Sequence, residues 1–274
     1  MSKFILSCTT CALRAPFKDE VSETFRHAPP AGFKYWGTAG PALWTPFIGP
    51  WLDAQRIRSE AKKVGLKGCT EVYCPQIDTS SPGNAVKSIE TIVQQAEFAV
   101  RLKSPLLVFT GGQRQEGTKG LEATVAGLEA LMPRLEKMPI RVALEPHFDS
   151  QFQDAADYDY IFGHLDHPQL GITVDTGHFH SAKVDTKAFI RKYAPKIWNV
   201  HLKDHIGTQS VAIGSGEIDL KGIFQTLHEI KYQGALALEI EPVEHEKLPQ
   251  FVAESYKYIL GLLKSLDGKG MKIL

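Results

Sequence analysis

Short apolar segments alternate with longer amphipathic segments along the whole 274-residue chain. In the segment 86–103, apolar residues recur every three or four positions from Ile89 to Val100, which places them on one face of a helix. The same periodicity predicts further helices over Asp53–Val64, Leu121–Leu135, Thr186–Tyr193, Leu220–Ile230 and Phe251–Leu266. Eight apolar runs have the length of buried strands: Phe4–Ser7, Lys34–Gly37, Glu71–Tyr73, Leu106–Thr110, Arg141–Glu145, Gly171–Asp175, Trp198–Leu202 and Ala235–Ile240.

This alternation of strands and helices predicts βαβ units and a parallel sheet of the α/β class. Eight such units in a chain of this length fit a single (β/α)₈ TIM barrel, which typically needs about 250 residues. A doubly wound sheet is the alternative, but its dinucleotide-binding members carry a glycine-rich fingerprint after the first strand, where this chain reads SCTTCAL. We see no linker-like change in composition, so we expect one domain over residues 1–274. The loop from Gly37 to Pro50 is expected to pack over the barrel mouth.

The charge balance narrows the possible partners. The chain has 31 Lys and Arg residues against 31 Asp and Glu residues, so it lacks the basic excess that nucleic-acid binding usually requires. No apolar run approaches the ~18 residues of a membrane-spanning helix, and the first residues do not form a signal peptide. We therefore expect a soluble cytoplasmic protein with no nucleic-acid or membrane partner, and a homo-oligomer is compatible with the sequence.

The four cysteines are more consistent with ordinary thiols than with a special site. Cys8 and Cys11 form a CxxC pattern, which zinc sites and redox pairs share. A zinc ribbon needs a second such pair, whereas Cys69 and Cys74 have four residues between them. The strand-like run before Cys8 also differs from a thioredoxin-type motif, so we expect reduced thiols.

Four consecutive predicted strands end in residues that commonly bind metal ions. Glu145 ends RVALE, Asp175 ends GITVD, His201 lies in WNVHL and Glu239 follows ALAL, at spacings of 30, 26 and 38 residues, each close to one βα unit. Barrel active sites lie at the carboxyl ends of the strands, so these side chains should converge. Three buried carboxylates repel one another unless a cation neutralises them. The sequence therefore predicts one divalent ion, Mn²⁺ before Mg²⁺, Co²⁺, Fe²⁺ or Zn²⁺, because hard oxygen ligands predominate.

Further polar residues near these strand ends are candidates for contacts with a substrate. His178, in the loop after Asp175, and His147 are residues of a type that hydrogen-bonds hydroxyl groups, and Trp36 is of a type that can stack on the face of a sugar ring. Lys203 is a further candidate for binding substrate. Glu241 has the same strand parity as Glu239, but Glu239 follows the apolar run directly and is the better ligand candidate.

The segments LEPH, TVDTGH, VHLKD, IGSGEID and LALEIEP resemble the xylose isomerase-like TIM-barrel superfamily. That superfamily includes sugar isomerases and epimerases, inosose dehydratases and endonuclease IV. The resemblance extends from about Arg141 to Pro242. The N-terminal half resembles the superfamily only in its alternation of predicted strands and helices. It implies that Glu145, Asp175, His201 and Glu239 bind the metal. It also implies that Glu145 and Glu239 act as an acid/base pair and that His178 contacts the substrate.

The activity implied by this resemblance is a metal-dependent sugar isomerase or epimerase. Such an enzyme removes a proton next to a carbonyl of a small sugar or polyol and forms an enediolate. A dehydratase acting on a keto-polyol shares that step and is the main alternative. An endonuclease IV-like phosphoesterase is less favoured, because its three-metal site needs an Asp-x-His that is missing from HIGTQSVAIGSGEID. A sugar-binding barrel without activity is a further alternative.

We expect an unphosphorylated substrate. Barrels often bind phosphate in the region of the Gly214–Gly216 segment, but Glu217 directly follows that segment and would repel a phosphate group.

Overall fold

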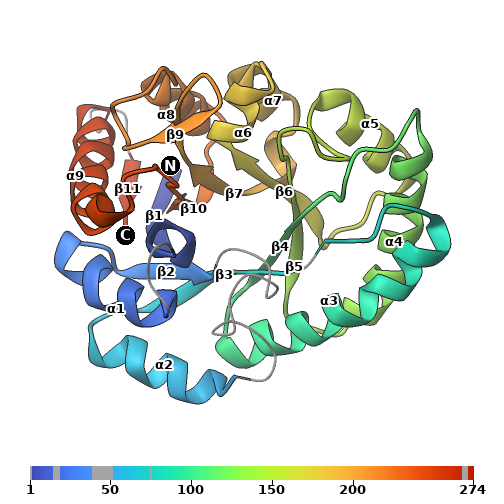
Figure 1. Ribbon diagram of the computed structural model, residues 1–274, viewed down its shortest axis with the longest axis horizontal. Coiled ribbons are helices and arrows are strands. Elements are labelled where there is room, and N and C mark those ends of the chain that lie inside the picture. Colours follow the sequence, from blue (N-terminus) through green and yellow to red (C-terminus); the bar gives the residue numbers. More distant parts are fainter. Residues whose placement is uncertain (1, 15–18, 39–51, 75, 267–270) are drawn as a thin grey trace.

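The computed structural model describes residues 2–14, 19–38, 52–74, 76–266 and 271–274. Its main feature is a ring of parallel strands in which each strand pairs with the next along the chain and the last, β10, pairs with β1 (Figure 1). The ring consists of β1 (Ser2–Thr9), β2 (Tyr35–Thr38), β3 (Gly68–Tyr73), β4 (Leu106–Thr110), β5 (Arg141–Glu145), β6 (Leu170–Asp175), β7 (Ile197–Leu202) and β10 (Gln233–Leu238). The closed ring confirms the predicted (β/α)₈ barrel.

The helices surround the ring of strands on the outside (Figure 1). They are α1 (Glu20–Ala31), α2 (Ala54–Lys63), α3 (Pro82–Leu102), α4 (Lys119–Leu135), α5 (Ala155–His164), α6 (Thr176–Ser181), α7 (Thr186–Lys192), α8 (Leu220–Glu229) and α9 (Leu248–Ser265). The periodicity did not predict α1, α5 or α6. The helix α1 buries Val21, Phe25 and Ala28 on one face, but Pro29 and Pro30 near its end are unusual inside a helix, and α6 has only six residues, too few for an amphipathic repeat.

Local sequence fixes where several helices begin. The side chains of Asp53 and Ser81 accept hydrogen bonds from backbone N–H groups in the first turns of α2 and α3. Asp154 does the same for α5, where Asp157 completes a capping box. The strands between the helices are buried on both faces, as in β6, in which all six residues are buried.

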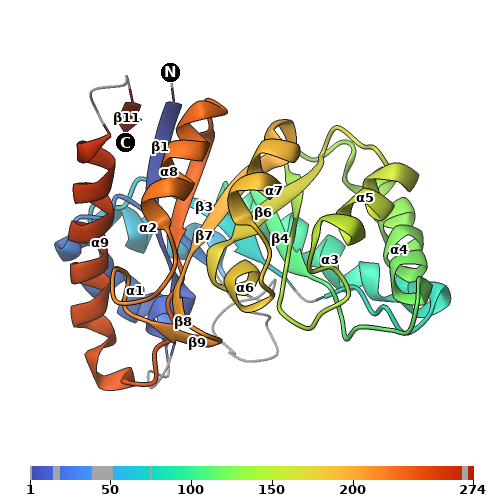
Figure 2. The ribbon, with the colours of Figure 1, turned by 90° about the horizontal axis from the view of Figure 1, so that it is seen from above.

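The two ends of the barrel differ in what covers them (Figure 2). Both chain termini and β11 (Met271–Ile273) lie at one end, where β11 pairs with Ser2–Phe4 of β1. The short helix α6 and the hairpin of β8 (Asp204–Ile206) and β9 (Gln209–Val211) lie at the opposite end, beside the carboxyl ends of the strands. Most of the loop expected to cover this mouth, residues 39–51, lies outside the described residues.

The cysteines and the lengths of the helices can be described in the same residues. The four cysteines are free thiols, and all of them are buried. No helix in the described ranges combines the length and the apolar character that crossing a membrane requires.

Candidate metal centre and active site

The structure brings the four predicted ligand residues together. One potential ligand atom from each of Glu145, Asp175, His201 and Glu239 lies within 4.8 Å of the other three. Glu145 and Asp175 end β5 and β6, His201 lies near the end of β7, and Glu239 directly follows β10. All four side chains are buried, with Glu239 the most exposed at 4%. The cluster is therefore preformed by the carboxyl ends of consecutive barrel strands.

His201 lies at the centre of the carboxylates. Its Nδ1 contacts Glu145 Oε1, lies 2.6 Å from Glu239 Oε2 and lies 3.9 Å from Asp175 Oδ2. Burial alone would lower the pKa of this imidazole, but the neighbouring Glu239, Glu71 and Glu145 outweigh burial and raise its pKa well above the ordinary value. The imidazolium thus supplies positive charge that the carboxylates require.

The carboxylates respond to this arrangement in different ways. Burial, opposed by His201, raises the pKa of Glu145 to about 7. Burial acts in the same direction on Glu239, but His201 and Lys203 hold the pKa of Glu239 well below its ordinary value. Asp175 Oδ2 is buried and accepts no hydrogen bond from the described residues. A divalent cation would satisfy that oxygen and the excess of negative charge, so the donor set fits a metal ion.

Lys203 contributes a second cation beside the cluster. Its side chain is buried, and Nζ lies 3.4 Å from Asp175 Oδ2 and 3.2 Å from Glu241 Oε2. Burial opposes the charge, but Asp175, Glu239 and Glu241 raise the pKa of this ammonium well above the ordinary value. Glu241 is therefore separate from the four-residue cluster and contacts its cationic neighbour, while its side chain is 45% exposed.

The two histidines expected to bind substrate lie side by side at this cluster. The ring centroids of His147 and His178 are 3.7 Å apart. His178 lies in the first turn of α6, not in a loop as expected, because Asp175 Oδ1 accepts a 2.7 Å hydrogen bond from its backbone N–H. Its Nε2 is 3.3 Å from Lys203 Nζ, and burial together with that ammonium lowers the pKa of His178 well below its ordinary value. A neutral imidazole therefore faces the pocket.

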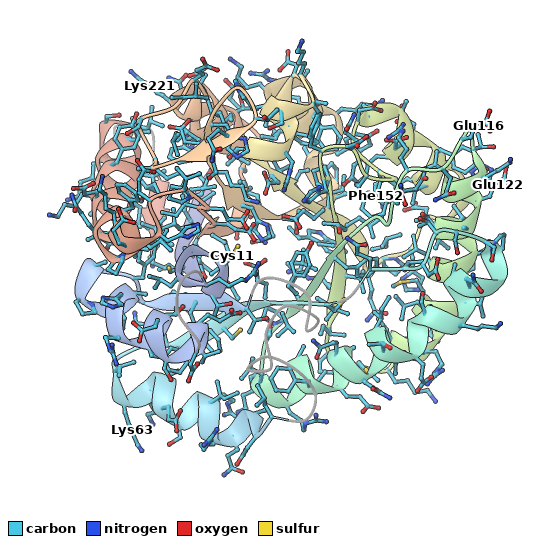
Figure 3. The ribbon with its side chains drawn as sticks, viewed as in Figure 1. Cys11, Lys63, Glu116, Glu122, Phe152 and Lys221 are labelled. Carbon is cyan, nitrogen blue, oxygen red and sulfur yellow. The ribbon has the colours of Figure 1, made fainter. Side chains whose placement is uncertain are left out.

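A small cavity of about 80 Å³ opens onto these residues. Its wall includes five residues that the sequence patterns did not indicate: Cys11, Arg14, Tyr73, Gln76 and Thr110. All five lie in or just after the first four strands, so proximity to a strand end is the signal that could have found them. Figure 3 shows Cys11 near the centre of the ring, whereas Lys63 and Lys221 point outward at its edge.

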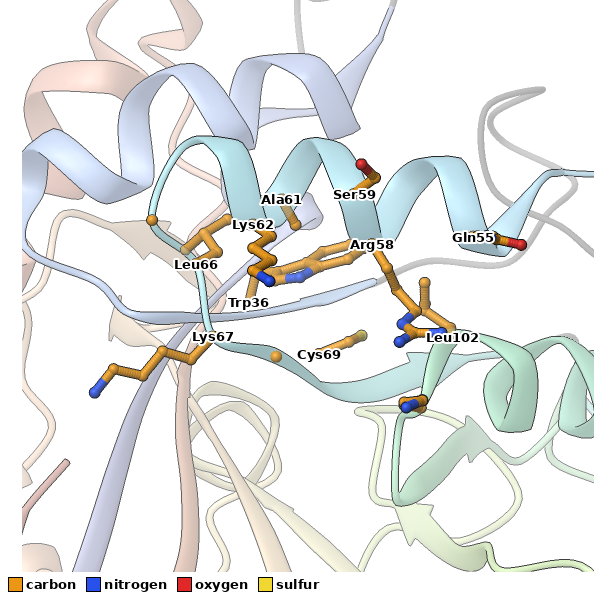
Figure 4. Close-up of a pocket in the computed structure, with 13 residues that line it drawn as sticks. Trp36, Gln55, Arg58, Ser59, Ala61, Lys62, Leu66, Lys67, Cys69 and Leu102 are labelled. Carbon is orange, nitrogen blue, oxygen red and sulfur yellow. The ribbon is translucent and has the colours of Figure 1, made fainter.

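The structure does not place Trp36 in this cavity. Its side chain is only 1% exposed and packs edge-on against Phe25 of α1, with the ring centroids 4.9 Å apart. Trp36 instead lines a different cavity of about 830 Å³ on the outer wall, beside α2 and the start of β3 (Figure 4). The expected stacking of Trp36 on a sugar is therefore incorrect for this pocket, because its side chain points away from the barrel axis.

Comparison with known proteins agrees with the geometry. Residues 25–260 match the family described as the xylose isomerase-like TIM barrel. The chain belongs to this family. Among proteins of known function, it is 22% identical over 233 residues to an inosose dehydratase from Lactiplantibacillus plantarum, covering 77% of this chain and 74% of that protein. It is 27% identical over 154 residues to the inosose dehydratase of Clostridium tetani, covering 48% of this chain and 51% of that protein.

Several solved structures share the fold at lower identity. A D-tagatose 3-epimerase-like protein superposes with a TM-score of 0.79 at 20% identity, covering 96% of this chain and 98% of the other. The 3-keto-D-glucoside 4-epimerase of E. coli gives a TM-score of 0.77 at 17% identity, covering 94% and 99% of the chains. A probable 3-DHS dehydratase from Bacillus anthracis gives 0.76 at 17% identity, covering 95% and 99%. These similarities establish the barrel fold.

Proposed function

We propose that this protein is a divalent-metal-dependent sugar isomerase or epimerase that removes a proton next to a carbonyl of a keto-sugar. The observation that supports this proposal is the preformed cluster of Glu145, Asp175, His201 and Glu239, whose ligand atoms lie within 4.8 Å of one another. A divalent ion bound there would polarise the carbonyl and acidify the adjacent C–H bond. We propose Mn²⁺ as the ion, because three carboxylates and one imidazole suit a hard cation.

The two glutamates would divide the proton transfers between them. Glu145 and Glu239 come from β5 and the end of β10, with β6 and β7 between them in the ring. Both carboxylates line the cavity beside the cluster. Glu239 would take the proton and Glu145 would return one. Return to the same carbon gives epimerisation, and return to the neighbouring carbon gives isomerisation.

The remaining pocket residues favour a neutral, hydroxyl-rich substrate. His147, His178 and Lys203 would bind hydroxyl groups. Both cations in the pocket wall already lie near carboxylates, Lys203 at 3.2 Å from Glu241 and Arg14 at 3.6 Å from Glu20. A phosphate would have to compete with these carboxylates, so we expect the free sugar to react at least as well as its phosphate ester.

A dehydratase acting on a keto-polyol is the second candidate, favoured by the similarity to inosose dehydratases. This reaction begins with the same proton removal and then expels a β-hydroxyl group. Lys203 Nζ lies 3.3 Å from His178 Nε2 beside the cluster, where it could donate a proton to that leaving group.

One experiment separates these outcomes. The purified protein, loaded with Mn²⁺, is incubated in D₂O with a panel of ketoses and with an inosose. Deuterium at the carbon next to the carbonyl, together with an epimer or isomer, would support the first candidate. Loss of water with formation of a conjugated ketone would support the second. Absence of deuterium incorporation and of product with every substrate would contradict both.

A further inference from the structure

A buried carboxylate contacts His201 from the side opposite the proposed metal site and is not part of that site. Glu71 lies on β3, is fully buried and points into the barrel. Its Oε2 is 2.8 Å from His201 Nε2, and the amide of Asn199 donates to the same oxygen. Among the described residues, His201 is the only cationic partner within ion-pair distance of Glu71. Among the described residues, the Glu71 carboxylate therefore pairs only with the imidazole ring of His201.

The chain also makes room for this carboxylate. A Cβ atom at Gly37, on the neighbouring strand β2, would lie 2.8 Å from Glu71 Cγ and 2.9 Å from Oε1. These distances are shorter than real Cβ contacts, so only glycine leaves Glu71 in its observed position. Burying a carboxylate has a high desolvation cost, and a glutamine could accept the same N–H hydrogen bond with a smaller cost. Packing alone therefore does not explain a charged group here.

The two nitrogens of His201 face different partners. Nε2 faces Glu71, whereas Nδ1 faces Glu145, Asp175 and Glu239. Only a nitrogen with a free lone pair can bind a metal, and a neutral imidazole keeps its one proton on the other nitrogen. An Nε2–H group that donates to Glu71 therefore leaves the lone pair on Nδ1, directed at the three carboxylates.

We propose that Glu71 is a positioning residue that holds His201 in the tautomer with its proton on Nε2, and that it strengthens Nδ1 as a metal ligand. This inference rests on the proposed function, since it assumes that the four-residue cluster binds a divalent ion. Glu71 is not among the described residues of the cavity wall or of the four-residue cluster. Carboxylates in this position typically change metal affinity by about 10–100-fold.

The test uses Zn²⁺, a diamagnetic probe, with the 274-residue protein and four variants, of which Asp175→Asn removes a proposed ligand. Glu71→Gln keeps the shape and an acceptor oxygen but removes the charge, and Glu71→Leu removes both. Asp157→Asn is the matched control, because Asp157 is also buried but pairs with Arg114 at 3.1 Å, away from the cluster. Zn²⁺ affinity is measured by chelator competition, and ¹⁵N NMR of the histidines reports the His201 tautomer.

We expect the parent to show a proton on Nε2 and the metal on Nδ1. Zn²⁺ affinity should fall by about tenfold or more in Glu71→Gln and further in Glu71→Leu, with a disturbed Nε2–H signal, while Asp157→Asn changes neither. If Glu71→Leu does not fold, Glu71→Gln decides the matter. Parent-like affinity and tautomer in Glu71→Gln, with Zn²⁺ binding abolished by Asp175→Asn, would overturn this inference and leave the proposed function standing. A parent protein that binds no Zn²⁺ would overturn both.

Discussion

The two halves of the barrel contribute different chemistry to one pocket. From β5 to β10, four strands in succession end in ionisable side chains that form the proposed metal site. The half from β1 to β4 supplies mainly neutral side chains to the wall, including Cys11, Tyr73, Gln76 and Thr110. It also supplies Glu71, which reaches the cluster only through His201.

Strand spacing explains this division. Neighbouring strands lie about 4.8 Å apart, so side chains at the ends of consecutive strands can share one small ion. Of the first four strands, β1 and β4 adjoin these strands and β2 and β3 lie farther round the ring, and residues in or after β1, β3 and β4 contribute to the cavity wall. We therefore expect the C-terminal half to determine the reaction, and the N-terminal half to support the site and shape the substrate preference.

The largest expected effect is the loss of turnover when Glu239 becomes glutamine. Glutamine is nearly isosteric but cannot accept the proton, so kcat should fall by about 10²–10⁴-fold while the fold is retained. Metal occupancy must be measured together with the rate. Glu241→Gln is the control from the same segment, and it should have a much smaller effect, because Glu241 lies outside the cluster. Parent-like turnover of a metal-loaded Glu239→Gln variant would shift the assignment to Glu145.

Metal affinity should increase with pH. The carboxylates raise the pKa of His201 despite its burial, so a proton occupies the imidazole of the metal-free protein and competes with the ion. Below this pKa the affinity should rise by about tenfold per pH unit, with one proton released per ion bound above about pH 7 and up to two below it, where Glu145 is protonated as well. Calorimetric titration with Mn²⁺ in buffers of different ionisation enthalpy measures both quantities. Affinity that is independent of pH would argue against His201 as a ligand.

A substitution in the N-terminal half should weaken metal binding without changing a ligand. In Gly37→Ala, the added methyl group would displace Glu71, so Zn²⁺ affinity should fall by about tenfold. Gly83→Ala is the control, because a Cβ atom there meets nothing within 4 Å. Equal affinities of the two variants would mean that the N-terminal half does not support the cluster.

The smallest catalytic effect is expected for Trp36→Phe. Trp36 packs against Phe25 on the outer wall, so its loss should lower the free energy of unfolding by about 0.5–3 kcal/mol. The value of kcat/KM should stay within about twofold of the parent value. Denaturant unfolding and steady-state kinetics test the two statements separately. A large increase in KM with unchanged stability would instead indicate that Trp36 contacts the substrate.

The sequence alone determined the barrel and the convergence of its four candidate ligand residues. Each of the eight predicted strands overlaps a strand of the ring. Spacings of about one βα unit placed Glu145, Asp175, His201 and Glu239 at the ends of consecutive strands, and parallel strands bring such ends together. This inference succeeded because it depended only on the length of the repeating βα unit and on the order of the strands along the chain.

Only the tertiary structure decided which way the side chains of buried strands point. Barrel strands are buried on both faces, so their sequences lack the alternation that separates inward from outward positions. Trp36 and Glu71 both lie in such strands, and the first points to the outer helices while the second points to His201. The support that Glu71 gives to His201 joins residues 130 positions apart, and the register of a closed ring of strands brings them into contact.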